Sequence, residues 1–124
     1  MSHLAPHCTS YQKVKKVLED EAKGIYQGKI YVKKNAQKTD AYQLSKAILL
    51  NNETEFDAKP ELEIYADDVK CSHGSSSGNL DENAIFYLMS SGLDRKQATN
   101  LLIEGFFRDI AETINHTEIK KYLI

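Results

Sequence analysis

The sequence predicts an α+β fold, with strands in the first part of the chain and helices in the last. Apolar segments with strand-like alternation are centred at Ile30, Ile48 and Ile64, 18 and 16 residues apart. After residue 79 the apolar spacing becomes helical. The 124 residues are 41% hydrophobic and 27% charged, a composition typical of folded globular chains. We therefore expect a strand-rich part over residues 1–78 and a helical part over residues 79–124.

Three strands are predicted by alternation and by the β-branched and aromatic residues they carry. They cover residues 28–33, 42–50 and 62–66, and each is followed by a polar turn. Short strands at this spacing suit either an antiparallel meander or the coils of a β-solenoid. Leu62, Ile64 and Ala66 share one face and Tyr65 takes the other, which favours a solenoid with an apolar inside.

The helical part has clear start and stop signals. Residues 71–79 are small and polar, and their composition predicts a flexible linker. Asp81 then caps a helix running to about Met89, which Ser91-Gly92 ends. Asp94 caps the next helix with Gln97 as its capping-box partner, and residues 117–123 form a third. The apolar stripe of the long helix, which includes Leu101, Leu102, Phe106, Phe107 and Ile110, is wider than one core needs.

Charge and cysteine content narrow the function classes. Residues 11–46 carry nine Lys and four acids, a net +5, whereas residues 47–124 carry seven basic and fourteen acidic residues, a net −7. The basic part lacks the aromatic and helix-turn-helix patterns of nucleic-acid binding, so no nucleic-acid partner is expected. No apolar run is long enough to span a membrane. Two cysteines form no disulfide framework, which favours a reducing, cytoplasmic compartment.

The strongest chemical candidates are Cys71 and His73. Two residues apart in an extended segment, they share a face and offer a thiolate and an imidazole, both ligands of iron or zinc. Two ligands are too few for a complete site, and the spacing alone favours a buried Cys beside a turn-capping His. His3, His7 and Cys8 form a second cluster, where a strand or turn without chemistry is favoured.

The sequence also resembles a known family. The run Lys59–Gly74, reading KPELEIYADDVKCSHG, is similar to the signature of the SufB/SufD family of iron–sulfur cluster assembly scaffolds. Its Cys-Ser-His-Gly form is closer to the SufD branch. Further similar stretches lie at residues 24–30 and 36–40 upstream, and at 78–82 and 86–93 downstream.

The resemblance implies a right-handed β-helix followed by a C-terminal helical domain. It further implies a non-enzymatic scaffold that pairs with a SufB-type subunit and docks a SufC-type ATPase on its helices. The residues of the wide apolar stripe would then bind the partner, namely Leu101, Leu102, Phe106, Phe107 and Ile110. A transient iron–sulfur cluster would be shared at the interface, with His73 as a ligand and Cys71 in a less certain role. The expected location is cytoplasmic, or a plastid-type organelle in a eukaryote.

Two other functions stay open. One is a small protein-binding adaptor without cluster chemistry, and the other is an enzyme using Cys71 or Cys8 as a nucleophile beside a histidine. Members of the resembled family are several times longer, so the chain is expected to correspond to their last coils and helices. An uncovered solenoid end could also pair with a second copy, which predicts a homodimer of the isolated piece.

Overall fold

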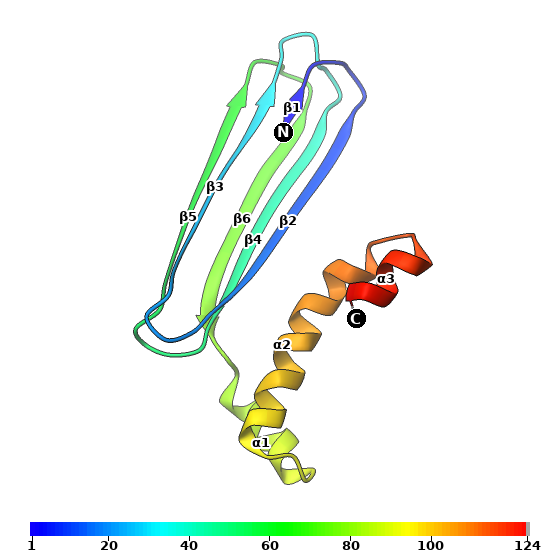
Figure 1. Cartoon of the computed structure of the whole chain (residues 1–124). Helices are drawn as coiled ribbons and strands as arrows, with labels where there is room; N and C mark the ends of the chain where they lie inside the picture. Colours follow the sequence, from blue (N-terminus) through cyan, green and yellow to red (C-terminus); the bar gives the residue numbers. More distant parts are fainter. Residues whose placement is uncertain (124) are drawn as a thin grey trace. The chain divides into compact units, whose positions relative to one another are not determined.

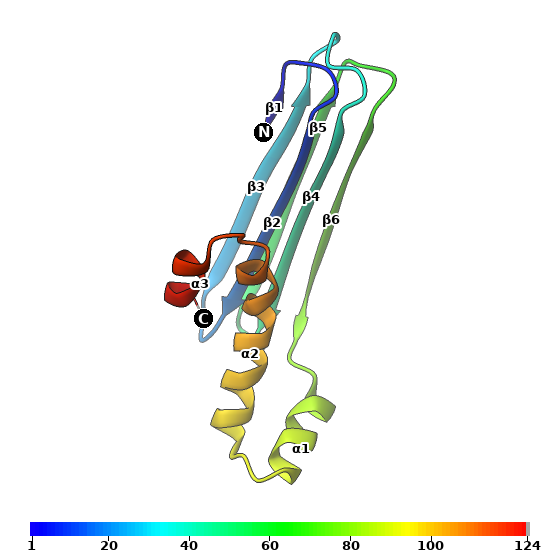
Figure 2. The ribbon, with the colours of Figure 1, turned by 90° about the vertical axis from the view of Figure 1, so that its right-hand side faces the viewer.

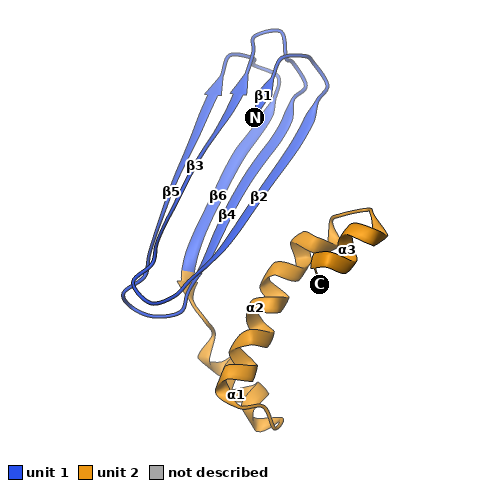
Figure 3. Ribbon diagram, in the orientation of Figure 1, with its two compact units in different colours: residues 1–77 blue, residues 78–124 orange. Residues whose placement is uncertain are grey.

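A computed structural model describes residues 1–123 of the chain, which form two compact units, residues 1–77 and 78–123 (Figure 3). The first unit holds strands and the second holds helices, which confirms the α+β class. Among the described residues no helix is long and apolar enough to cross a membrane. The strands are β1 (Ser2–His3), β2 (Thr9–Leu18), β3 (Lys23–Val32), β4 (Asp40–Leu49), β5 (Glu55–Ile64) and β6 (Lys70–Asn79).

Successive strands alternate between two sheets (Figures 1 and 2). One sheet has the order β1-β3-β5 and the other β2-β4-β6. The registered pairs are parallel, with Thr9 opposite Asp40 and Lys23 opposite Glu55, separations of 31 and 32 residues. One coil is therefore about twice the 16–18-residue spacing seen in the sequence, because that spacing counts strands in both sheets. This parallel arrangement fits a β-helix-like fold and excludes an antiparallel meander.

The turns of successive coils also stack through hydrogen bonds. The amide of His7 donates to the Gln37 carbonyl at 2.9 Å, and that of Lys38 donates to the Asp68 carbonyl at 2.7 Å. His7 and Lys38 occupy equivalent places and both have φ 62°, a left-handed conformation uncommon outside Gly, Asn and Asp. The Gln37 side chain reaches the next coil, donating to the Asp67 carboxylate at 2.8 Å.

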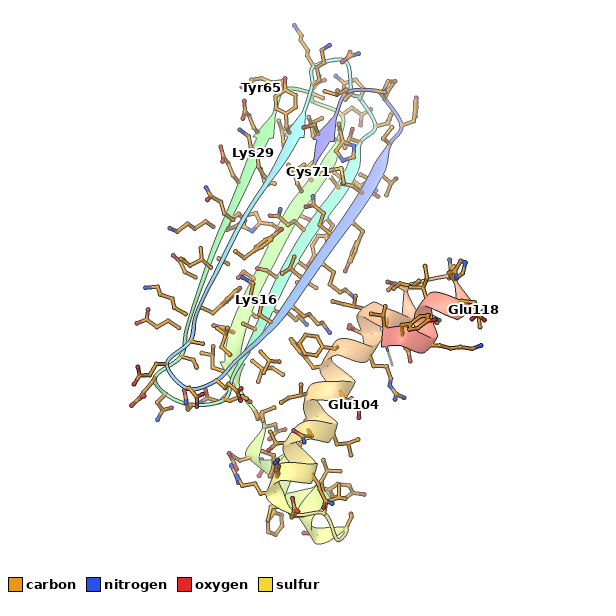
Figure 4. All side chains as sticks on the ribbon, in the orientation of Figure 1. Lys16, Lys29, Tyr65, Cys71, Glu104 and Glu118 are labelled. Atoms are coloured by element: carbon orange, nitrogen blue, oxygen red, sulfur yellow. The ribbon has the colours of Figure 1, made fainter. Side chains whose placement is uncertain are left out.

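The core lies between the two sheets, because its members come from facing strands. Ile30 and Val32 of β3 are fully buried and cluster with Ala41 of β4. Leu62 and Ile64 of β5 pack against this cluster. Ala66 is buried while Tyr65 is 59% exposed, which confirms the predicted inside and outside faces. Tyr65 and Lys29 lie on the outside, where both contact Glu63 (Figure 4).

The sequence patterns miss the strands β1 and β2 and assign another segment wrongly. The lysine-rich β2 has no strong apolar alternation, so its pattern does not mark it as a strand. Residues 71–79 were predicted as a flexible linker, but the structure places them in β6, so that prediction is wrong. Small residues fit this strand because a Cβ on Gly74 would lie only 2.9 Å from the Tyr42 hydroxyl of the neighbouring strand. Such a strand shows no hydrophobic period to detect.

The helical unit follows its sequence signals closely. Helix α1 (Glu82–Ser90) begins after Asp81, whose carboxylate accepts from the Asn83 amide at 2.9 Å. Helix α2 (Arg95–Glu112) begins with the predicted capping box of Asp94 and Gln97, with both bonds formed at 2.8 and 2.9 Å. Helix α3 covers Thr117–Leu123. The predicted helix ends at Ser91-Gly92 and the third helix are thus confirmed.

Candidate functional site

Strand β6 carries both candidate ligands, and its register against β4 fixes which way they face. The Lys70 amide donates to the Thr39 carbonyl at 2.8 Å, and the Ser45 hydroxyl donates to the Ser75 hydroxyl at 3.2 Å. From the first contact to the second, the residue number rises on both strands. Strand β6 is therefore parallel to β4, and paired residues are about 30 positions apart. Strand β6 is also the last strand of its sheet, which leaves its outer edge unpaired among the described strands.

This offset places Cys71 beside Ala41 and His73 beside Gln43. Ala41, Gln43 and Ser45 are buried positions that alternate along β4, so they face the inside of the two-sheet stack. Cys71 and His73 therefore occupy inward positions of β6, and Figure 4 labels Cys71 near the start of that strand. Since β6 is the last strand of its sheet, these positions lie at the end of the stack of described strands.

The Cys71 thiol is half-buried and packs against the hydrophobic core. Burial is the main cause that raises its pKa above the ordinary thiol value. A backbone hydrogen bond at Ala41 partly offsets this, and the Asp40 carboxylate adds to the increase. A raised pKa keeps the thiol protonated at neutral pH, which disfavours both nucleophilic attack and unassisted metal binding.

His73 differs from Cys71 in being exposed. An exposed imidazole at an uncovered strand can reach a ligand or a partner without any movement of the fold. Residues 1–123 contain no group of three or more His, Cys, Asp or Glu side chains placed to hold a metal ion. His73 and Cys71 are therefore an incomplete ligand set within this part of the chain.

The second candidate cluster, His3, His7 and Cys8, lies in a strand and a turn. His3 is 5% exposed on β1, and its Nε2 lies 2.7 Å from the Ser10 hydroxyl. Cys8 is exposed, and its thiol donates to the Pro6 carbonyl at 3.6 Å. His7 occupies a turn with a left-handed backbone. The structure thus assigns this segment to a strand and a turn, as the favoured interpretation of the sequence expected.

A Cys–His nucleophile pair needs a third group that orients the histidine, and the nearby aspartates have other partners. Asp67 accepts from Gln37, and Asp68 forms an ion pair with Lys38 at 2.5 Å. Both interactions tie one turn to the turn of the preceding coil. Asp40 lies close enough to Cys71 to raise its pKa, the opposite of what an activated nucleophile requires.

Two buried amides escaped the sequence reasoning. Gln43 is 1% exposed, and neither its Oε1 nor its Nε2 has a hydrogen-bond partner among the described residues. Gln12 is paired with Gln43 on the neighbouring strand β2, and its Nε2 is also buried without a hydrogen-bond partner among the described residues. The available signal was the alternation of β4, which places Gln43 inward between Ala41 and Ser45.

The helical unit presents the expected apolar side chains. Leu101 is 46% exposed and Phe107 39% exposed, while the other three predicted partner-binding residues, Leu102, Phe106 and Ile110, are half-buried. Phe107 also lines a groove of about 460 Å³ between α2 and α3. Glu104, labelled in Figure 4, and Arg108 line the same groove, so its lining combines apolar and charged side chains.

Comparison with known proteins relates this architecture to one family. The model of the SufBD core domain of the SUF system for FeS cluster assembly matches residues 1–106. The iron–sulfur cluster assembly protein SufD of Escherichia coli is 36% identical over the whole chain. A SufBD family protein of Synechocystis is 38% identical over 88% of the chain, and the chloroplastic protein ABCI7 of Arabidopsis thaliana is 36% identical over 84%.

The chain spans 29% of the length of the Escherichia coli relative, 24% of the Synechocystis protein and 22% of the Arabidopsis protein. The family model nevertheless covers all six strands and most of the helical unit. The chain therefore belongs to the SufBD core family.

Proposed function

We propose that the chain acts in iron–sulfur cluster assembly as a non-enzymatic scaffold of the SUF complex. Its strand unit is the end of a right-handed β-helix, and its helices form a C-terminal helical domain. The nascent cluster is the cargo, shared transiently between His73 of this chain and ligands of a SufB-type subunit. A SufC-type ATPase docks on the helices. A cytoplasmic or plastid location goes with this function.

The observation that carries the proposal is the placement of His73. It is exposed, lies on the last strand of its sheet and has too few neighbouring ligands to hold a metal ion within the described residues. Tetrahedral iron or zinc sites need four ligands. An incomplete set at an uncovered strand edge is what a site shared with a second subunit requires.

Cys71 has a smaller role in this proposal. Burial raises its pKa, so the thiol becomes a ligand only when a metal ion displaces its proton. His73 needs no such deprotonation step, since imidazole binds metal in its neutral form. We therefore expect His73 to be the essential ligand and Cys71 to be an auxiliary one.

The helical surface supports the docking of a second partner. Leu101 and Phe107 expose large apolar side chains, which globular surfaces seldom gather on one helix without a binding role. A protein that used only this surface would be an adaptor without cluster chemistry. That alternative predicts partner binding that depends on Leu101 and Phe107 but not on His73.

The test is co-purification with SufB- and SufC-type partners, followed by anaerobic reconstitution and absorption spectroscopy. His73→Ala and His73→Asn should lower cluster formation while the complex still assembles. The matched control is His7→Asn, because Asn tolerates the left-handed backbone of that exposed turn. Phe107→Asp should reduce ATPase binding, with Phe86→Asp on the exposed face of α1 as its control.

Each outcome separates the alternatives. Loss of cluster formation in both His73 variants, with normal assembly of the complex, supports the scaffold function. Normal cluster formation in both variants would rule out the proposed site. If only Phe107→Asp has an effect, the adaptor function is the better description.

A further inference from the structure

We propose that Gln43 is a positioning residue for His73, accepting a hydrogen bond from one ring nitrogen so that the other faces outward toward the metal. This inference rests on the proposed function for its role in cluster assembly. The juxtaposition itself rests on the fold alone.

Gln43 stands out because its amide is buried without a partner. It is 1% exposed, and neither amide atom is hydrogen-bonded within the described residues. Buried polar groups without a partner are rare and costly, so such a group calls for a ligand or a neighbour that completes it. The fold also makes room for it, because a Cβ on Gly28 would lie 2.3 Å from Nε2.

The strand register makes His73 its neighbour at the uncovered end. Two contacts flank the pair, the backbone bond of Lys70 to Thr39 before it and the bond of Ser45 to Ser75 after it. Both contacts join residues about 30 positions apart, so Gln43 and His73 are paired as well. Adjacent strands are about 4.8 Å apart, so two inward side chains at paired positions are within hydrogen-bond reach after rotation of the exposed imidazole. The hydroxyls of Ser45 and Ser75, at the next inward positions of β4 and β6, bond to each other.

A hydrogen bond from His73 to Gln43 would serve metal binding by the histidine. Such a histidine almost always donates its second ring N–H to an acceptor, which fixes the tautomer and the ring orientation. Gln43 Oε1 is an acceptor of this kind. Gln12 carries the same side chain at the paired position of β2, but β4 lies between it and β6, so it cannot reach His73.

The experiment measures the tautomer ratio of His73 by ring ¹⁵N NMR of the full chain at about pH 8, where histidine is neutral. The wild type should strongly favour one tautomer, and Gln43→Met should return the ratio to that of free histidine. Gln43→Glu, which keeps an acceptor, should restore it, and Gln12→Met is the matched control that leaves it unchanged. Met fills a similar volume to Gln, so a melting temperature close to that of the wild type shows that the fold is retained in Gln43→Met.

A second arm measures cluster formation in the reconstituted complex, where Gln43→Met should lower the rate by about 10- to 100-fold. A wild-type tautomer ratio in Gln43→Met would overturn the inference, as would a change of equal size in Gln12→Met. If the tautomer ratio responds as expected but His73→Ala leaves cluster formation normal, the pairing holds and the proposed function fails.

Discussion

Replacing Gly28 by Ala tests the packing inside the strand unit most sharply. Gly28 lies on β3 and faces inward, where an added Cβ would lie 2.3 Å from Gln43 Nε2 and 2.5 Å from the Tyr26 hydroxyl. Contacts below 3.0 Å require a shift of the neighbours. Both atoms end flexible side chains, but Gln43 is 1% exposed, so its amide must shift within the packed interior and not into solvent.

The size of the effect follows from two opposing terms. Overpacking a buried site costs about 1–3 kcal/mol. Restricting the unfolded chain by a Gly to Ala change returns about 0.4–1 kcal/mol. We therefore expect a net loss of roughly 1–2 kcal/mol, and each kcal/mol lowers the melting temperature of a 60–100-residue unit by about 4–8 °C.

The assay is urea and thermal unfolding followed by circular dichroism at strand-sensitive wavelengths. Gly78→Ala on β6 is the matched control, because a Cβ there meets no atom within 4 Å and should cost nothing. The loss of unfolding free energy in the double variant Gly28→Ala/Gln43→Ala should be smaller than the sum of the losses in the two single variants, because the second change removes the clashing amide. Equal stability of Gly28→Ala and Gly78→Ala would refute the packing described for Gln43.

Three further predictions concern other parts of the chain. Gly105→Ala in α2 should stabilise the helical unit by up to about 1 kcal/mol, since a Cβ there meets no neighbour and glycine is a poor helix former; a lower melting temperature would contradict this. Asp94→Ala should destabilise the same unit by about 1 kcal/mol through loss of the capping box, measured by helical circular dichroism, whereas Asp94→Ser should retain most of the stability. The alkylation rate of Cys71 should keep rising with pH beyond the ordinary thiol range, because burial raises its pKa; in a Cys8→Ser background, a rate that levels off below about pH 8 would contradict the assignment.

Local signals determined most of the helical unit, whereas the strand unit depended on contacts distant in sequence. Capping at Asp81 and Asp94 involves residues two or three positions apart, so the sequence contains the whole motif. Strand β6 instead depends on β4, about thirty residues earlier, which accommodates its small residues against Tyr42 and Ser45. Composition alone described this segment as a linker because its partners lie elsewhere in the chain.

In the candidate site, too, the local features could be predicted from the sequence and the features that depend on distant contacts could not. The two-residue spacing of Cys71 and His73 was visible in the sequence, and their inward positions follow from strand alternation. The difference between them, a half-buried thiol and an exposed imidazole, depends on where the stack ends. Gln43 escaped notice because its significance comes from burial without a hydrogen-bond partner, which only the packed structure reveals.

The measurement that tests the central claim most directly is cluster formation by the His73→Ala variant in the reconstituted complex. The account predicts a complex of normal composition whose iron–sulfur absorbance develops at least about tenfold more slowly than in the wild type. Wild-type absorbance, reached at the wild-type rate, would contradict the assignment of His73 as a ligand shared with the partner subunit.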